Sequence, residues 1–409
     1  MNLFERHLYQ QLITQIDDRE FIIISGARQT GKSTILKQIA NFLAGRENKY
    51  FEISLEDFHV LAKLNDHPEN LFSYVPKPQN TEKIYVLLDE IQYLQNPTNF
   101  LKFIYDKFSS NLKIIATGSS AFYIDTKFKD SLAGRKQLFE LSTLSFTEFL
   151  LFKTANNLLN EELQEIRRNN RYLSSKRIEI ANYFDEYLTY GGFPAVVLAE
   201  KNEKKLSLLK ELLNSYIKRD IAEANIQNQE KFYNLLLILA EQTGNLLNVN
   251  EISQTLGLST TSVNNYLYVL QKCFHISLLR PYYRNMRKEL TKMPKIYFND
   301  LGLRNVLLNQ FQHIETRLDK GALLENYLYL RLIEKYSSDN LRYWRTINGN
   351  EVDFVVLNGL ESGFAIECKF QNQNYKPKFY NVFTEAYPQI PIQFRTYKAE
   401  NNGSWVLSV

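Results

Sequence analysis

The chain has 409 residues, of which 44% are hydrophobic and 23% are charged. Both fractions are close to globular averages, so the chain can bury real cores, and its length leaves room for about two to four domains. The net charge of +4 is small at this length and does not by itself indicate a nucleic-acid-binding protein. Cys273 and Cys368 lie far apart without metal-type spacing, which predicts reduced, buried thiols and excludes a disulfide framework.

The amino-terminal residues MNLFERHLYQQL carry two charged side chains, Glu5 and Arg6, where a secretory signal peptide needs an uncharged apolar core. No stretch of the sequence approaches the length of unbroken apolar residues that a membrane span requires. We therefore expect a soluble, cytoplasmic protein with no membrane partner.

The first part of the chain alternates strand-like and helical patterns. Apolar, strand-like runs begin at Phe21, near Tyr50, at Glu82 and at Asn111. A helical pattern follows the first run, and another, NPTNFLKFIYDKF, precedes the fourth. Strands that alternate with helices predict a parallel sheet covered on both faces, so the expected fold class is α/β.

The loop after the first strand, GARQTGKS at residues 26–33, matches the P-loop pattern between an apolar strand and a helix. Glycines let backbone N–H groups surround phosphates, Lys32 reaches the β- and γ-phosphates, and the Ser33 hydroxyl binds Mg²⁺. The helix that begins here adds the positive end of its dipole. The predicted nucleotide-binding residues of this loop are Gly26, Ala27, Arg28, Gln29, Thr30, Gly31, Lys32, Ser33 and Thr34.

The run IYVLLDEIQ ends in an Asp-Glu pair. Asp89, at the end of a buried strand, is placed to hold Mg²⁺ together with Ser33, and Glu90 can orient or deprotonate the attacking water. Alone, such a pair is also typical of a solvated strand end. Downstream of a P-loop it predicts the Walker B element of an ATPase, with Glu90 and Lys32 as catalytic residues and ATP and Mg²⁺ as cofactors.

Further positions are candidates for contact with the γ-phosphate. In IIATGSS, Thr117 or Ser119 follows a strand at the place of a phosphate sensor, although a plain strand-to-helix turn has the same composition. Arg135, in SLAGRKQ, lies in a short loop after them. It is a candidate catalytic arginine finger in cis or in trans, because phosphoryl transfer gains from an added cation. An ordinary surface arginine is the alternative.

The segment NVNEISQTLGLSTTSVNNYLYVL fits helix-turn-helix spacing, with Gly257 in the turn and Ser259 at the start of the second helix. The strand-like runs that follow are typical of a wing, so residues 247–300 are interpreted as a winged-helix module. If this module binds DNA, the exposed face of the second helix carries Thr260, Thr261, Asn264 and Asn265. That face has no Lys or Arg at its start, so packing or protein contacts are the alternative.

Near the carboxyl end, NGNEVDFVV and FAIECKF predict two strands joined by a hairpin turn. Asp353 is in the first strand, and the period of two places Glu367 and Lys369 on one face of the second. In PD-(D/E)xK nucleases such acids hold Mg²⁺ and the lysine steadies the attacking water. A solvated hairpin has the same spacing. The candidate second metal site, with one acid from the preceding helix, is Glu325, Asp353, Glu367 and Lys369.

The motifs GARQTGKST, LLDEIQ, TGSS, SLAGR, GGFP, YFNDLGLR, GALLEN and NEVDFVV occur in the order seen in a widespread prokaryotic ATPase family, which the whole chain resembles. That family has an AAA-like P-loop domain followed by a carboxy-terminal domain of unassigned function that is similar to restriction endonucleases. The resemblance implies ATP binding and ATP hydrolysis, but no biological role.

The expected organisation is an AAA-like P-loop domain at 1–150, a helical connection at 151–246, the winged-helix module at 247–300 and a restriction-endonuclease-like α/β domain at 301–409. The predicted function is an Mg²⁺-dependent ATPase coupled to nucleic-acid binding or processing, with DNA and a protein as candidate partners. The alternative is a regulatory or signalling ATPase switch whose carboxy-terminal domains only bind protein partners. Nuclease activity and the oligomeric state are left open.

Overall fold

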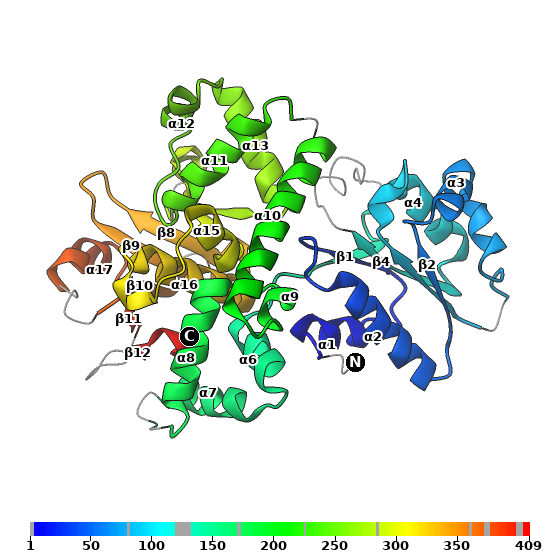
Figure 1. Ribbon diagram of the computed structural model, residues 1–409, viewed down its shortest axis with the longest axis horizontal. Helices are drawn as coiled ribbons and strands as arrows, with labels where there is room; N and C mark the ends of the chain where they lie inside the picture. The colour runs from blue at the N-terminus through cyan, green and yellow to red at the C-terminus, as the bar shows by residue number, and fades with distance from the viewer. Residues whose placement is uncertain are drawn as a thin grey trace. The chain divides into compact units, whose positions relative to one another are not determined.

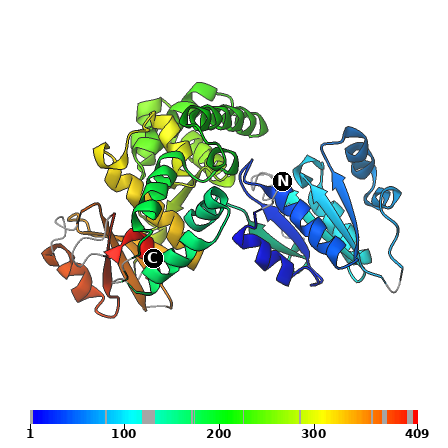
Figure 2. The ribbon, with the colours of Figure 1, turned by 60° about the horizontal axis from the view of Figure 1, so that its bottom comes forward.

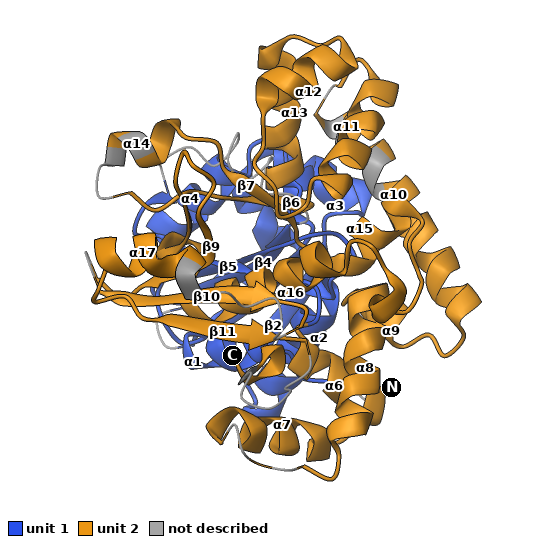
Figure 3. Ribbon diagram, turned by 90° about the vertical axis from the view of Figure 1, so that its left-hand side faces the viewer, with its two compact units in different colours: residues 1–144, 272–274 blue, residues 145–271, 275–409 orange. Residues whose placement is uncertain are grey.

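The computed structural model divides the chain into two compact units (Figure 3). They are Met1–Leu144 with Lys272–Phe274, and Ser145–Gln271 with His275–Val409. The predicted division into four domains stays a prediction. The structure describes residues 4–79, 82–118, 132–169, 172, 174–224, 226–283, 286–359, 362–371, 377–397 and 404–409. Within these ranges, no helix combines the length and the apolar character needed to cross a membrane.

The first unit is built on a five-stranded sheet with the order β2-β3-β4-β1-β5, in which all neighbours are parallel (Figure 1). Its strands are β1 (Phe21–Ser25), β2 (Lys49–Ser54), β3 (Ile84–Asp89), β4 (Leu112–Gly118) and β5 (Lys136–Glu140). The predicted α/β class with a parallel sheet is confirmed. Because β4 lies between β1 and β3, its carboxyl end lies between the P-loop and the Asp-Glu pair.

Helices cover both faces of this sheet. On one face, α1 (His7–Thr14) and α2 (Lys32–Gly45) lie side by side (Figure 2). On the other face lie α3 (Phe58–Asp66), the 3-10 helix Pro68–Ser73 and α4 (Pro97–Phe108). Each face therefore has its own apolar core.

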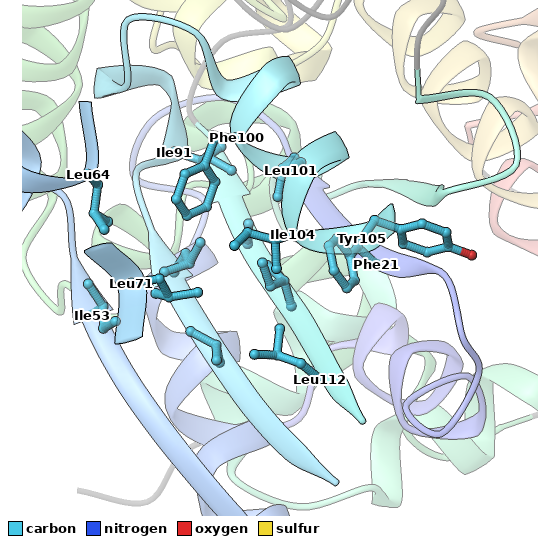
Figure 4. Packing of buried hydrophobic residues seen from close by; sticks show 14 of the residues in the cluster. Phe21, Ile53, Leu64, Leu71, Ile91, Phe100, Leu101, Ile104, Tyr105 and Leu112 are labelled. Atoms are coloured by element: carbon cyan, nitrogen blue, oxygen red, sulfur yellow. The ribbon is translucent and has the colours of Figure 1, made fainter. Parts of the chain in front are cut away.

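Strand β1 contributes to both cores. Ile22 and Ile24 belong to the core beneath α2, whereas Phe21 and Ile23 belong to the core beneath α4. Figure 4 shows the second core, where the ring of Phe21 meets that of Tyr105 edge to face at a centroid distance of 5.1 Å. Burial on both faces explains why the sequence of β1 is a continuous apolar run rather than an alternating one.

The second unit begins with a run of helices. A capping box fixes the start of the first one, because the Ser145 hydroxyl accepts the Glu148 N–H and the Glu148 carboxylate accepts the Ser145 N–H. The helices are α6 (Phe146–Thr154), α7 (Leu158–Arg168), α8 (Arg177–Tyr190), α9 (Pro194–Val197), α10 (Asn202–Glu223) and α11 (Gln229–Glu241).

The next segment contains the helix pair and the strand pair that the winged-helix interpretation requires. Gly257, at φ +58°, joins the two helices, and the two strands are antiparallel. The elements are α12 (Val249–Leu256), α13 (Thr260–Lys272), β6 (Ile276–Leu279), α14 (Met286–Thr291) and β7 (Lys295–Phe298). The helix pair and the two strands agree with the expected elements, whereas α14 was not expected. The winged-helix assignment itself stays a prediction.

The end of the chain forms a mixed sheet with the order β12-β11-β10-β9-β8. Strands β8, β9 and β10 are antiparallel neighbours, and β11 is parallel to β10. The elements are α15 (Leu301–Leu308), α16 (Lys320–Tyr336), β8 (Leu341–Arg345), β9 (Glu351–Leu357), β10 (Gly363–Lys369), α17 (Asn381–Ala386), β11 (Ile392–Thr396) and β12 (Ser404–Trp405). The predicted hairpin is present as β9 and β10. The restriction-endonuclease-like assignment stays a prediction.

The motifs GGFP and YFNDLGLR bring α8 and α15 into close contact. A Cβ atom at Gly302 would lie 2.1 Å from the carbonyl oxygen of Tyr190, so only glycine permits this approach. The Asp300 carboxylate caps α15 by accepting the Leu303 N–H at 2.9 Å, and it also accepts the Gly192 N–H at 2.8 Å. These two motifs therefore have a packing role.

A buried ion network also involves α15. Arg304 Nη1 and Arg317 Nη2 lie 2.6 and 2.7 Å from Asp319 Oδ2, and Arg317 Nε donates to Asp319 Oδ1 at 2.8 Å. Both arginine side chains are 1% exposed. Burial alone would raise the pKa of the Asp319 carboxyl, but the hydrogen bonds from the two arginines lower it to about 2. Asp319 is therefore the shared counter-ion of two buried charges.

Candidate functional site

The loop between β1 and α2 requires glycine at both ends. Gly26 has φ +150°, and a Cβ atom there would lie 2.2 Å from the carbonyl oxygen of Leu141. Gly31 has φ +100° and is the residue before α2. Side chains are disfavoured in both conformations, so the glycine spacing follows from the backbone path. The amino end of α2 comes directly after the loop, where unpaired N–H groups and the helix dipole attract anions.

Lys32 is held inside this loop. Its ammonium group donates to the carbonyl oxygens of Gly26 at 2.9 Å and Ala27 at 2.8 Å, and the residue is only 5% exposed. Burial lowers the pKa of Lys32 to about 8, against the opposing effect of the Glu90 and Asp89 carboxylates. The loop thus holds an ammonium group whose charged form becomes more stable when further negative charge lies nearby.

Arg6 supports the same loop from outside the motif. Its Nη1 atom donates to the Thr30 carbonyl at 2.8 Å, and its Nη2 atom donates to the Ser142 carbonyl at 2.8 Å. Arg6 is 6% exposed. The guanidinium therefore ties the P-loop to the segment that follows β5, and it fixes the position of a backbone that carries the predicted phosphate contacts.

The Asp-Glu pair is connected to the end of β4. The Thr117 hydroxyl, which is fully buried, donates to Asp89 Oδ1 and accepts the Glu90 N–H at 3.1 Å. Glu90 has φ +61°, in the left-handed region. The buried Gln92 side chain donates to Glu90 Oε2. Thr117 and Gln92 therefore fix the two acids, which lie at the carboxyl edge of the sheet beside the P-loop.

The residues present fit a magnesium ion bound together with phosphates. Ser33 and Thr34 are exposed on the first turn of α2, and Asp89 is half-buried. Hydroxyl and carboxylate oxygens are the ligands that Mg²⁺ prefers, and in nucleotide sites phosphates and water complete its shell. Ser33 and Asp89 are thus suited to hold the ion.

Two predicted residues are not found at this site. Ser119 lies outside the described residues. Arg135 precedes β5, and its carbonyl accepts the N–H of Phe21 at 2.9 Å, which places it at the amino edge of the sheet. The P-loop lies at the carboxyl edge, and the Arg135 guanidinium is paired with Asp106 at 2.7 Å. This placement contradicts a catalytic role in cis, whereas a role in trans stays a prediction.

The residues predicted for the carboxy-terminal site do lie near one another. Asp353 and Glu367 are 6% and 3% exposed, and the Asp353 N–H donates to Glu367 Oε2 at 3.2 Å. The Cys368 N–H donates to Asp353 Oδ2 at 2.9 Å. Lys369 forms an ion pair with Glu367 Oε1, and the Tyr380 hydroxyl donates to the same oxygen at 2.9 Å.

A lysine outside the predicted motif lies among the other acids. The ammonium nitrogen of Lys295, on β7, lies 2.9 Å from Glu325 Oε1, 2.6 Å from Glu351 Oε1 and 3.7 Å from Asp353 Oδ1. Its side chain is 1% exposed. Burial disfavours the charged form of Lys295, but the three carboxylates outweigh burial and raise its pKa above the ordinary value. The Tyr297 hydroxyl also donates to Glu325 Oε1, at 2.7 Å.

We call Glu325, Glu351, Asp353 and Glu367 the carboxylate cluster. Burial and the nearby Asp353 charge raise the pKa of the Glu325 and Glu367 carboxyls. Among the residues that the structure describes, no three His, Cys, Asp or Glu side chains are arranged to hold a metal ion. The expected second Mg²⁺ site at Glu325, Asp353, Glu367 and Lys369 is therefore not supported. The physical reason is that Lys295 and Lys369 already form ion pairs with these acids.

Three segments match known domain families. Residues 18–150 match the AAA domain, and this match contains the parallel sheet, the P-loop and the Asp-Glu pair. Residues 181–313 match a domain of unknown function (DUF8612), and residues 320–405 match another (DUF4143). The first unit is therefore an AAA-type P-loop domain, a class that binds nucleotides. Neither of the other matches supports the restriction-endonuclease-like or winged-helix interpretation.

Similar proteins occur in bacteria and archaea. A protein of Haemophilus influenzae is 28% identical over 371 residues, covering 87% of this chain and 84% of its own length. A protein of Methanocaldococcus jannaschii is 27% identical over 372 residues, covering 89% and 78%. The similarity therefore extends over nearly the whole chain. Both proteins are described only as uncharacterized, so the similarity adds no activity.

Solved structures with some likeness include the ORC1 protein of Aeropyrum pernix in complex with DNA and AMPPCP-bound DnaA of Aquifex aeolicus. The first has a TM-score of 0.34 and 11% identity, and it covers 76% of this chain and 93% of that chain. The second has a TM-score of 0.33 and 15% identity, with coverages of 66% and 89%. TM-scores this low do not establish a shared overall fold.

Sequence reasoning missed the roles of Arg6, Gln92 and Lys295. Gln92 is two residues from Glu90 and is the last residue of LLDEIQ, so the motif itself was a signal for its contact with Glu90. Lys295 is a charged residue at the start of the apolar run KIYF, which is a signal for a buried ion pair. Arg6 has no local signal, because its partners are carbonyl groups far along the chain.

Proposed function

We propose that this protein is an Mg²⁺-dependent ATPase that converts ATP to ADP and phosphate at the P-loop. The observation that carries the proposal is the position of Lys32, Asp89 and Glu90 at neighbouring points on the carboxyl edge of one parallel sheet. Nucleotide binding alone needs only Lys32 and Asp89. Glu90, fixed by the Gln92 amide, adds a group that can act on water.

Each residue has a separate task in this proposal. Lys32 exchanges its two loop carbonyls for the β- and γ-phosphates, and Ser33 and Asp89 hold the metal ion. When bound, Mg²⁺ neutralises charge that develops on the phosphates. Glu90 orients the attacking water and accepts its proton. Thr117 keeps Asp89 and the Glu90 backbone in place through its hydroxyl.

Nucleotide binding is expected to take up a proton above about pH 8, because bound phosphates favour the charged form of Lys32. Affinity should therefore fall as the pH rises from about 8 to about 9. Calorimetric titration with a non-hydrolysable ATP analogue, in buffers of different ionisation enthalpy, measures the uptake. The matched control is Lys32→Arg, whose guanidinium does not titrate. Equal uptake in both proteins would contradict this assignment.

We also propose that ATP turnover is coupled to DNA through the exposed face of α13. That face presents hydroxyl and amide groups, which can donate to and accept from base edges. Its exposed residues are Thr260, Thr261, Asn264, Asn265 and Tyr268.

The test uses the full-length protein with ATP, with Mg²⁺ or EDTA, and with single- or double-stranded DNA. We expect phosphate release that requires Mg²⁺ and increases with DNA. Binding measured by fluorescence anisotropy should weaken with salt. The double variant Asn264→Ala/Asn265→Ala should bind DNA more weakly at unchanged basal hydrolysis, whereas Glu211→Ala, an exposed change on α10, should behave as wild type.

One observation favours a second function. The exposed face of α13 has no Lys or Arg, although phosphate contacts normally supply much of the affinity for DNA. A regulatory or signalling ATPase switch with a protein partner would explain that face without cationic residues. Mg²⁺-dependent hydrolysis without salt-sensitive DNA binding or stimulation in the same assay would select this alternative.

A further inference from the structure

The carboxylate cluster and its two lysines belong to the second unit, whereas the P-loop belongs to the first. Lys295 belongs to β7, while its acidic partners belong to α16 and β9. Two of those acids are within hydrogen-bond distance of the ammonium nitrogen, at 2.9 Å for Glu325 and 2.6 Å for Glu351. Asp353 lies at 3.7 Å. A single cation therefore faces three carboxylates.

Oxygens of Asp353 and Glu367 also have partners within the protein. Asp353 Oδ2 accepts the Cys368 N–H at 2.9 Å, and Glu367 Oε2 accepts the Asp353 N–H at 3.2 Å. Glu367 Oε1 accepts the Tyr380 hydroxyl at 2.9 Å and is paired with Lys369. At Asp353 Oδ2 and at both oxygens of Glu367, lone pairs that a metal-dependent nuclease would direct at its ion are therefore directed at protein donors.

An ammonium group and a divalent ion place different demands on such a cluster. The ammonium has three donors at ordinary hydrogen-bond length, whereas Mg²⁺ needs six oxygens in near-octahedral geometry at about 2.0–2.1 Å. An ammonium offsets part of the negative charge of the carboxylates, but it cannot lower the pKa of a bound water as a metal does. Lys295 therefore supplies a cation to the cluster without supplying metal chemistry.

We propose that the Lys295 ammonium is the resident cation of the carboxylate cluster, occupying the position that Mg²⁺ would take. The carboxy-terminal sheet is then not a metal-dependent nuclease centre. Lys295 also joins β7 to β9 and α16, so the strand pair β6–β7 and the carboxy-terminal sheet are held as one body within the second unit.

The test measures Mn²⁺ binding by electron paramagnetic resonance, with full-length, nucleotide-free protein. Mn²⁺ uses the same oxygen ligands as Mg²⁺, and it gives an electron paramagnetic resonance signal. Only binding that Asp353→Asn removes is counted, which excludes ions held at the P-loop. We expect wild type and Asp353→Asn to bind equally. We expect Lys295→Met to gain a site that binds Mn²⁺ at least about tenfold more tightly than the wild-type protein does. We expect Lys295→Met/Asp353→Asn to lose this site.

Asp353-dependent Mn²⁺ binding by the wild-type protein would overturn the proposal. So would Asp353-dependent cleavage of plasmid DNA by the wild type in Mn²⁺ or Mg²⁺. A folded Lys295→Met variant that gains no site would also overturn it, because Lys295 would then not occupy a cation position. If Lys295→Met does not fold, the comparison of wild type with Asp353→Asn decides the question alone.

Discussion

Lys32→Ala is expected to abolish nucleotide binding at any practical concentration. The lysine supplies charge-assisted hydrogen bonds to two phosphates, and each such bond contributes about 1.5–3 kcal/mol. Losing both should weaken binding by about 3–6 kcal/mol, which is a hundredfold or more. The measurement is titration of the purified variant with a fluorescent ATP analogue.

The control for this variant is Lys37→Ala, an exposed lysine further along α2. It removes the same charge from the same helix without touching the loop, so its affinity should match that of wild type. Because Lys32 also satisfies the Gly26 and Ala27 carbonyls, the thermal midpoints of all three proteins should be compared. Wild-type affinity in a folded Lys32→Ala protein would contradict the assignment.

Asp319→Ala is expected to destabilise the second unit more than any exposed substitution. It leaves Arg304 and Arg317 buried without their shared counter-ion. Removing one partner of a buried ion pair typically costs about 3–5 kcal/mol of unfolding free energy. Urea denaturation followed by tryptophan fluorescence measures this unit alone, because the chain has two tryptophans, Trp344 and Trp405, and both lie in the second unit.

The matched control is Glu165→Ala in the same unit, which breaks an exposed ion pair with Arg168 at 2.7 Å. Exposed pairs of this kind contribute little to stability. The tryptophan transition of Glu165→Ala should coincide with that of wild type. If Asp319→Ala behaves the same way, the network is not holding α15 and α16 in place.

The sequence was sufficient for four of the five strands of the first sheet and for its P-loop, because their signals are local. Strand β1 is a continuous apolar run, the loop follows it directly, and α2 begins within the motif. Strand β5 was not anticipated, because KQLFE is short, has mixed exposure and is not a continuous apolar run. The other edge strand, β2, was predicted although it is also partly exposed, so an edge position alone does not hide a strand.

Residues that act across the fold were harder to predict. Arg135 follows the P-loop in the chain, but parallel strands place it at the opposite edge, where it pairs with Asp106. The period of two in β10 placed Glu367 and Lys369 on one face, where they form an ion pair. The contacts of Lys295 with Glu325 and Asp353 were not predictable, because they depend on how β7 packs against α16 and β9 in the folded chain.

The most direct test of the central claim is the comparison of nucleotide binding and phosphate release in Glu90→Gln. The substitution keeps the size of the side chain and removes the carboxylate that acts on water. Removing a positioned general base typically slows a reaction by about 10²–10⁴-fold. We predict wild-type affinity for ATP with Mg²⁺, and phosphate release reduced by about that factor. Hydrolysis at the wild-type rate by Glu90→Gln would contradict the assignment of Glu90, and with it the proposed mechanism.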